Sequence, residues 1–117
     1  MKSGIYIVEL LNKEKLCSYN GDRRRKGKGT LVGLGNLKFG KSVDLDRRRK
    51  NYIHYFGNEN VNFLVIHRTL NIDQIEKLVK SDVSQFRVIS VKGRPLEWLQ
   101  GINSSQLQSF ILKHCHV

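Results

Sequence analysis

Apolar residues recur at two spacings along the chain, and each spacing predicts a type of element. Residues 4–11 (GIYIVELL) are β-branched and aromatic, which is typical of a strand. Residues 30–39 predict a second strand, weakened by Gly33 and Gly35, and residues 61–67 (VNFLVIH) predict a buried strand. We therefore expect a small sheet of three strands.

Three other segments have helical spacing and begin next to residues that cap helices. They span residues 44–56, 71–86 and 104–113, and the turn residues 93–95 (GRP) break the chain before the last of them. The predicted order is β-β-α-β-α-α. At 117 residues the chain predicts a single domain over 1–117. The expected class is α+β, with a small three-stranded antiparallel-type sheet flanked by helices.

Helical phase places one arginine on an inward-facing stripe. The apolar stripe of the first helix consists of Leu45, Tyr52 and Phe56. Arg48 follows Leu45 by three residues and precedes Tyr52 by four, so it falls on this stripe. A charge on a core-facing stripe is costly unless an opposite charge or a ligand meets it.

A glutamate occupies the matching position on the second helix. Glu76 lies four residues after Ile72 and three before Val79, on the apolar stripe of that helix. Three interpretations remain open for Arg48 and Glu76. They form a structural ion pair, or the arginine extends to the rim of the core with its charged end in water. Alternatively they line a cleft in which arginine meets a phosphate and glutamate meets a metal ion.

The charge balance indicates a polyanionic partner. Lys and Arg number 21 against 10 acidic residues, for a formal net charge of +11. Such a field attracts phosphates, because nucleic-acid binding releases condensed counterions. A membrane surface is the other polyanion, but it usually requires a basic amphipathic helix that is not evident here. We therefore expect nucleic acid as the partner, and no membrane.

Compartment follows from what the sequence lacks. No apolar run reaches the length of a membrane helix, and the N-terminus does not have the layout of a signal peptide. Two cysteines, Cys17 and Cys115, cannot build a disulfide framework. An intracellular protein is expected, with cytoplasm and nucleus both open.

Residues 35–42 (GNLKFGKS) match the phosphate-loop pattern G-x-x-x-x-G-K-[ST] at every position. A small nucleotide-binding protein is the function that this match predicts. It is the less favoured alternative, because the chain has no room for a multi-stranded parallel sheet after the loop. The strand at 61–67 is also followed by Arg68 rather than by a magnesium-binding aspartate.

The order of several short motifs resembles the GIY-YIG nuclease superfamily. Residues 4–6 (GIY) open the chain, residues 38–48 (KFGKSVDLDRR) lead into the helix that carries Arg48, and Glu76 lies on the next helix. Residues 94–99 (RPLEWL) look like the Glu-Trp-Phe ending of a phage- and virus-associated branch. Lys38 stands in place of the second tyrosine, as in that branch, and a basic insertion at about 20–29 separates the first two motifs. An asparagine that many relatives carry after the glutamate helix has no clear match.

The resemblance implies a divalent-metal-dependent endonuclease that hydrolyses phosphodiester bonds, with DNA as the favoured substrate. It implies that Glu76 is the single protein carboxylate on Mg²⁺ or Mn²⁺, that Tyr6 accepts a proton from water and that Arg48 braces the phosphate. A tyrosine base requires a nearby cation to lower its pKa, which Lys38 or Lys41 would supply. The implied catalytic residues are Tyr6, Lys38, Lys41, Arg48 and Glu76.

Two basic runs are expected to contact phosphates without reading the base sequence. They comprise Arg23, Arg24, Arg25, Lys26 and Lys28 in the insertion, and Arg47, Arg49 and Lys50 on the first helix. A non-catalytic nucleic-acid-binding module on the same fold is the main alternative to the enzyme, because the second tyrosine and the asparagine of the family pattern are missing. A homodimer is a further possibility, because a protein with one active site would need two copies to cut both strands of a duplex.

Overall fold

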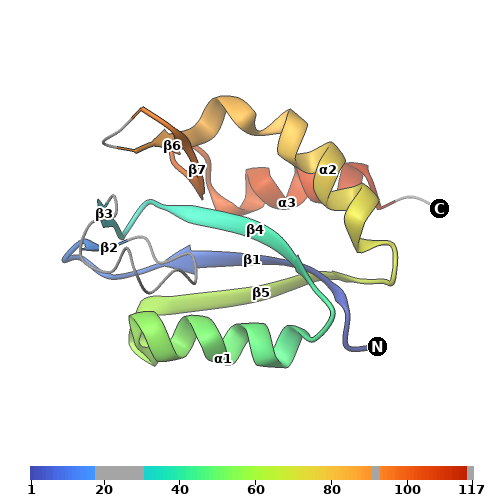
Figure 1. The fold of residues 1–117 in the computed structure, drawn as a ribbon, viewed down its shortest axis with the longest axis horizontal. Coiled ribbons are helices and arrows are strands. Elements are labelled where there is room, and N and C mark those ends of the chain that lie inside the picture. Colours follow the sequence, from blue (N-terminus) through green and yellow to red (C-terminus); the bar gives the residue numbers. More distant parts are fainter. Residues whose placement is uncertain (18–30, 91–92, 116–117) are drawn as a thin grey trace.

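The central strand is β1 (Gly4–Leu10), which pairs on both sides in a five-stranded antiparallel sheet of order β5-β1-β4-β7-β6 (Figure 1). This computed structural model describes residues 1–17, 31–90 and 93–115. The α+β class is confirmed. The prediction of three strands is wrong, because the sheet has five.

The two additional strands come from the segment that was expected to be a chain break. β6 (Arg87–Ile89) and β7 (Pro95–Leu99) pair antiparallel, with Gly93 at φ 81° in the turn between them. Proline is tolerated at the first residue of a strand, as at Pro95. The predicted order β-β-α-β-α-α is therefore wrong where this hairpin follows the second helix.

The strand predicted at 30–39 is also divided differently. β3 (Leu31–Val32) pairs with β2 (Leu16–Cys17) in a separate two-stranded sheet, and β4 (Leu37–Ser42) enters the main sheet. Gly35, at φ 95°, lies in the turn between β3 and β4. A positive φ suits glycine and ends an extended segment there. The basic insertion predicted at about 20–29 lies outside the described residues.

The helices follow the predicted phases, and their ends are set by local chemistry. α1 (Leu45–Phe56) begins where the Asp44 side chain accepts a hydrogen bond from the Arg47 backbone N–H. A short 3₁₀ turn, η2 (Asn58–Asn60), then leads into β5 (Val61–Arg68). The remaining elements are α2 (Ile72–Asp82), η3 (Ser84–Phe86) and α3 (Ser104–Lys113). The helix predicted to reach Phe86 therefore ends at Asp82, and the separate 3₁₀ turn η3 covers the rest of the predicted segment.

The sheet is covered on both faces, by α1 on one side and by α2 and α3 on the other (Figure 1). Alternate residues of β1 serve the two cores. Tyr6 and Val8 belong to the core under α1, whereas Ile5 and Ile7 belong to the core under α2 and α3. Among the described residues, no helix is long and apolar enough to cross a bilayer.

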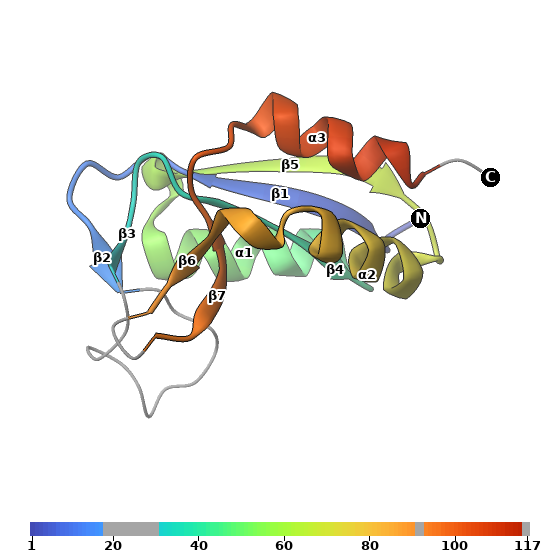
Figure 2. The same ribbon diagram turned by 90° about the horizontal axis from the view of Figure 1, so that it is seen from above.

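Within the described part of the chain, one edge of β4 is mostly unpaired. β4 pairs with β1 along its whole length, but its pairing with β7 is confined to Leu37 and Leu99. The two strands run in different directions beyond that point (Figure 2). Residues 38–42 of β4 therefore form an open sheet edge between the layer of α1 and the layer of α2.

Candidate active site

Tyr6 lies at the centre of the sheet, with its hydroxyl in a hydrogen-bonded group under α1. The Tyr6 and Tyr52 hydroxyl oxygens are 2.9 Å apart, and Arg48 Nη1 donates to Tyr6 Oη at 3.2 Å. The Tyr6 ring stacks on Phe63, with centroids 4.8 Å apart. The register of β1 and β4 places Gly40 opposite Tyr6. Arg48 and Tyr6, two of the implied catalytic residues, are thus in direct contact.

Burial dominates the acidity of both tyrosines. Burial, reinforced by Tyr52, raises the pKa of Tyr6 well above its ordinary value of 10, and the nearby cations Lys38 and Arg48 lower it by smaller amounts. Burial likewise raises the pKa of Tyr52 to about 12. The expectation that a lysine lowers the pKa of Tyr6 is confirmed in direction for Lys38, but burial outweighs this effect and the net pKa is still raised.

Lys38 lies on the same face of β4 as Gly40, towards α1. Its side chain is 10% exposed, and its Nζ is 2.9 Å from Glu97 Oε2. The same Nζ is 5.7 Å from the ring centroids of both Tyr52 and Trp98. The positive charge of Lys38 lowers the pKa of Glu97. Lys38 is therefore a buried cation held by one carboxylate and two aromatic rings.

Lys41 and Glu76 belong to the opposite face of the same strand. Lys41 Nζ is 3.8 Å from Glu76 Oε1 and 2.5 Å from Asp73 Oδ1, both on α2. Lys38 and Lys41 are three residues apart, and an odd spacing in a strand reverses the face. The predicted catalytic residues are therefore divided between two faces of β4. Tyr6, Lys38 and Arg48 lie towards α1, and Lys41 and Glu76 lie towards α2.

Both charges on the inward stripes have partners, but not each other. Arg48 donates to Tyr6, whereas Glu76 faces Lys41. Within the described part of the chain, no ion pair of 4.0 Å or less joins Arg48 to Glu76. The interpretation of these two residues as a direct structural ion pair is wrong.

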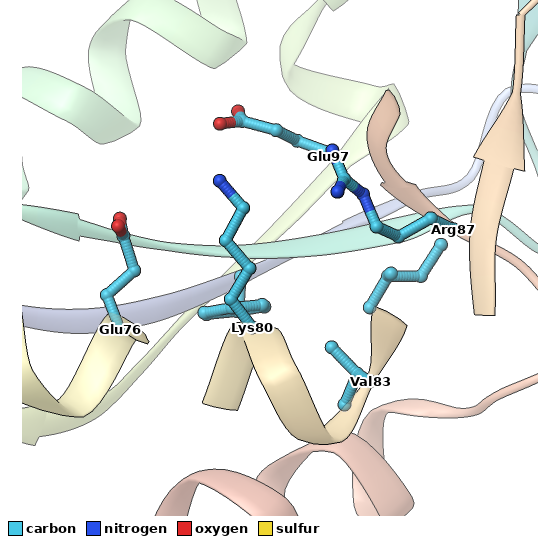
Figure 3. Close-up of a pocket in the computed structure, with 7 residues that line it drawn as sticks. Glu76, Lys80, Val83, Arg87 and Glu97 are labelled. Atoms are coloured by element: carbon cyan, nitrogen blue, oxygen red, sulfur yellow. The ribbon is translucent and has the colours of Figure 1, made fainter. Parts of the chain in front are cut away.

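A pocket lies beside the open edge, on the side of the sheet covered by α2 (Figure 3). Glu76 and Lys80 extend into it from α2, and Glu97 extends into it from β7. Its apolar lining consists of Phe39, Val83 and Leu99, and Arg87 completes it. Because Glu97 also binds Lys38, it connects the α1 side of β4 with the pocket that contains Glu76.

A metal ion at Glu76 would have few protein ligands. The Glu76 side chain is 29% exposed, so its carboxylate is accessible to an ion. The described residues contain no group of three or more His, Cys, Asp or Glu side chains that would hold a metal. Mg²⁺ commonly binds through one or two carboxylates and keeps several waters. Glu76 fits that pattern, with water and substrate oxygens as the remaining ligands.

One of the two predicted basic runs lies within the described residues. Arg47, Arg49 and Lys50 are exposed along α1, on either side of the half-buried Arg48. The other run lies in the insertion, outside the described residues. It consists of Arg23, Arg24, Arg25, Lys26 and Lys28.

Two neighbours of the predicted residues were not assigned from the sequence. Tyr52 lies four residues after Arg48 on the same stripe and was interpreted as core; it contacts the Tyr6 hydroxyl. Helical spacing relative to Arg48 was the signal available for it. Glu97 was noted as part of a terminal motif, but its contact with Lys38 spans 59 residues and has no local signal.

The phosphate-loop match has a different geometry. Its residues 37–42 form β4, and they pair with β1 from Leu37↔Glu9 to Ser42↔Gly4. A phosphate loop instead presents free backbone N–H groups at a helix N-terminus. These residues therefore do not adopt the conformation that nucleotide binding would need.

Comparison with known proteins adds no relative. No family model, no curated protein and no solved structure matches the chain.

Proposed function

We propose that the protein is a metal-dependent endonuclease of the GIY-YIG type that hydrolyses phosphodiester bonds, with DNA as the favoured substrate. The observation that carries the proposal is the hydrogen bond from Arg48 to Tyr6 beneath α1. Motif order singles out both residues, helical phase singles out Arg48 independently, and the two residues meet beside an open sheet edge.

Arg48 is suited to brace a phosphate. Its guanidinium is half-buried and carries donors beyond the one directed at Tyr6. A planar fork binds two phosphate oxygens at once, which a lysine does not do. The exposed cations Arg47, Arg49 and Lys50 surround it on the same helix and suit an approaching phosphate backbone.

Tyr6 is the proposed acceptor of the proton from the attacking water. As a buried phenol with a raised pKa it is protonated at neutral pH, so the base form is rare. Arg48 and Lys38 are the two cations that favour its ionised form. The proximity of these two cations supports Tyr6 as the proton acceptor, whereas burial keeps the fraction of ionised Tyr6 small at neutral pH.

Glu76 is the residue that would hold Mg²⁺ or Mn²⁺. When bound, the ion would neutralise negative charge on the scissile phosphate. In the protein itself, Lys41 Nζ lies 3.8 Å from Glu76 Oε1, and it hydrogen-bonds Asp73 on the same helix. Lys41 therefore has two roles in the proposal, as counter-charge of Glu76 and as a cation near the substrate.

A non-catalytic nucleic-acid-binding module is the second candidate, and two observations favour it. Burial raises the pKa of Tyr6, which disfavours a role as general base. Glu76 also already has an ion-pair partner in Lys41. The basic surface of α1 serves this function equally well. A homodimer would suit cleavage of both strands of a duplex, and sizing of the protein with and without DNA tests it.

A cleavage assay separates the candidates. Plasmid and single-stranded DNA are incubated with the wild type, Glu76→Ala and Arg48→Ala in Mg²⁺ or Mn²⁺, with Glu59→Ala as an exposed acidic control. The enzyme predicts cleavage that both site variants abolish and the control retains. Salt-sensitive binding without cleavage by the wild type supports the binding module, and ATP hydrolysis supports nucleotide binding. Cleavage that survives Glu76→Ala excludes the metal role of Glu76.

A further inference from the structure

A single ion pair spans the gap between β4 and β7. Backbone pairing of these strands is confined to Leu37 and Leu99, and one residue further along β4 the side chains of Lys38 and Glu97 meet at 2.9 Å. Beyond the last backbone pair, this ion pair is the contact that links β4 to β7. It is the contact that fixes the position of the Lys38 side chain at the open edge.

The two partners differ in their surroundings. Lys38 is 10% exposed and lies against the rings of Tyr52 and Trp98, whereas Glu97 is 54% exposed. A buried ammonium without a counter-charge is costly, so it moves towards water when its partner is removed. Glu97, being half in solvent, has no such constraint. The position of the Lys38 side chain therefore depends on Glu97 more than the position of Glu97 depends on Lys38.

Glu97 is itself held in place. The Arg87 guanidinium donates to the backbone carbonyls of Leu96 at 2.6 Å and Pro95 at 3.1 Å, which fixes the strand just before Glu97. On the pocket side, the positive charges of Lys80 and Arg87 act on the Glu97 carboxylate (Figure 3). The carboxylate is thus oriented by its own backbone and by cations on α2 and β6.

We propose that Glu97 is a positioning residue that holds the Lys38 ammonium beside the Tyr6–Tyr52 pair, where its positive charge supports proton transfer to Tyr6. This inference rests on the proposed function. It assigns to Glu97 a task at the site, carried out through Lys38 rather than through contact with the substrate.

Trp98 offers a direct readout of where the Lys38 charge lies. It is the single tryptophan of the chain, and its ring centroid is 5.7 Å from Lys38 Nζ. Lys38→Met removes a positive charge near the indole and defines the direction of the emission shift. If Glu97 acts by holding Lys38, Glu97→Ala shifts the emission in that same direction. If Glu97 acts only through its own negative charge, its removal shifts the emission in the opposite direction, or not at all, and the inference is overturned.

Cleavage kinetics test the consequence for the reaction. We expect Glu97→Ala to lower kcat by roughly 10- to 100-fold, as for other residues that orient a catalytic group, with KM changed by less than about twofold. Glu59→Ala is the matched control and retains the wild-type kcat. An unchanged kcat in Glu97→Ala, with the wild type active, overturns the inference and leaves the proposed function standing. A wild type that cleaves nothing overturns the proposed function and the catalytic part of the inference, and the emission shift alone then decides whether Glu97 holds Lys38.

Folding of the variants is checked by circular dichroism at the assay temperature. If Glu97→Ala is unfolded, Glu97→Gln replaces it in both measurements, because glutamine keeps the shape of the side chain and removes its charge. Glu97→Gln must then give the same two outcomes. Its Trp98 emission shifts in the same direction as that of Lys38→Met, and its kcat is lowered at constant KM.

Discussion

The Tyr6 hydroxyl lies directly over the Cα of Gly40, so close that a Cβ at residue 40 would overlap the hydroxyl oxygen and the ring. The glycine of residues 38–40 (KFG) is therefore needed for packing rather than for backbone freedom. It allows Tyr6 to cross β4 and reach Arg48 and Tyr52.

Gly40→Ala is expected to destabilise the protein by about 1–3 kcal/mol, the usual cost of overpacking a core. Urea unfolding followed by Trp98 fluorescence measures this loss. In the double variant Gly40→Ala/Tyr6→Phe the closest clash is removed, so the combined loss should be smaller than the sum of the two single losses. Strict additivity of the two changes would show that Tyr6 does not press on Gly40.

Helical phase was a reliable guide because it depends only on local geometry. Leu45, Tyr52 and Phe56 are buried as predicted, and Arg48 and Glu76 are both half-buried. The same reasoning in strands would have separated Lys38 from Lys41, since residues three apart on a strand face opposite ways. Of the two lysines that could have been near Tyr6, only Lys38 is on its side of the sheet.

Long-range pairing was what the sequence could not provide. β6 has only three residues, too few to give a clear strand pattern. Its pairing with β7 depends on the turn at Gly93, and the local sequence of that turn predicts only a break in the chain. The contact between Lys38 and Glu97 depends in turn on that hairpin. The apolar run at residues 4–11 already allows a core position for Tyr6, but the rise in its pKa depends on the packing of α1 over its hydroxyl, which is a long-range contact.

The cleavage rate should rise with pH if Tyr6 is the proton acceptor. The active form is the phenolate, and burial raises the pKa of Tyr6 above its ordinary value of 10. The rate should therefore rise about tenfold per pH unit and continue to rise as far as pH about 10, without a plateau. Single-turnover cleavage in Mg²⁺ measures it, with circular dichroism to confirm folding at each pH. Tyr6→Phe should remove the slope, and a wild-type plateau near neutrality would assign the base to another group.

Arg48→Lys should be nearly as inactive as Arg48→Ala, because a single ammonium does not reproduce the guanidinium fork. We expect a loss of about 100-fold in kcat, the scale of removing one preorganised donor from a reacting centre. Arg94→Lys, an exposed change in the β6–β7 turn, is the control. Full activity in Arg48→Lys would mean that only positive charge is required at this position.

Acid should weaken the Lys38–Glu97 ion pair. Lys38 lowers the pKa of Glu97 from its ordinary value of 4.5, so the stabilisation is complete above pH about 4.5 and is lost as the pH falls through the lowered pKa. The difference in Tm between the wild type and Lys38→Met should therefore be constant near neutrality and shrink at lower pH. Lys77→Met, on the exposed side of α2, should show no such convergence. A difference in Tm that is independent of pH would mean that Lys38 stabilises the protein through the rings of Tyr52 and Trp98 and not through Glu97.

The exposed cations of α1 should determine how steeply binding depends on salt. If Arg47, Arg49 and Lys50 each contact a phosphate of duplex DNA, replacing all three with glutamine removes about 0.9 per contact from the slope of log K against log salt, or about 2.7 in total. Fluorescence anisotropy at several salt concentrations measures the slope, with Glu76→Ala as the background so that cleavage does not interfere. Lys77→Gln, which lies on the opposite layer of the fold, should leave the slope within error. A reduction by Lys77→Gln of about one third of that in the triple variant would show that the protein attracts DNA through its net charge and not through a defined surface on α1.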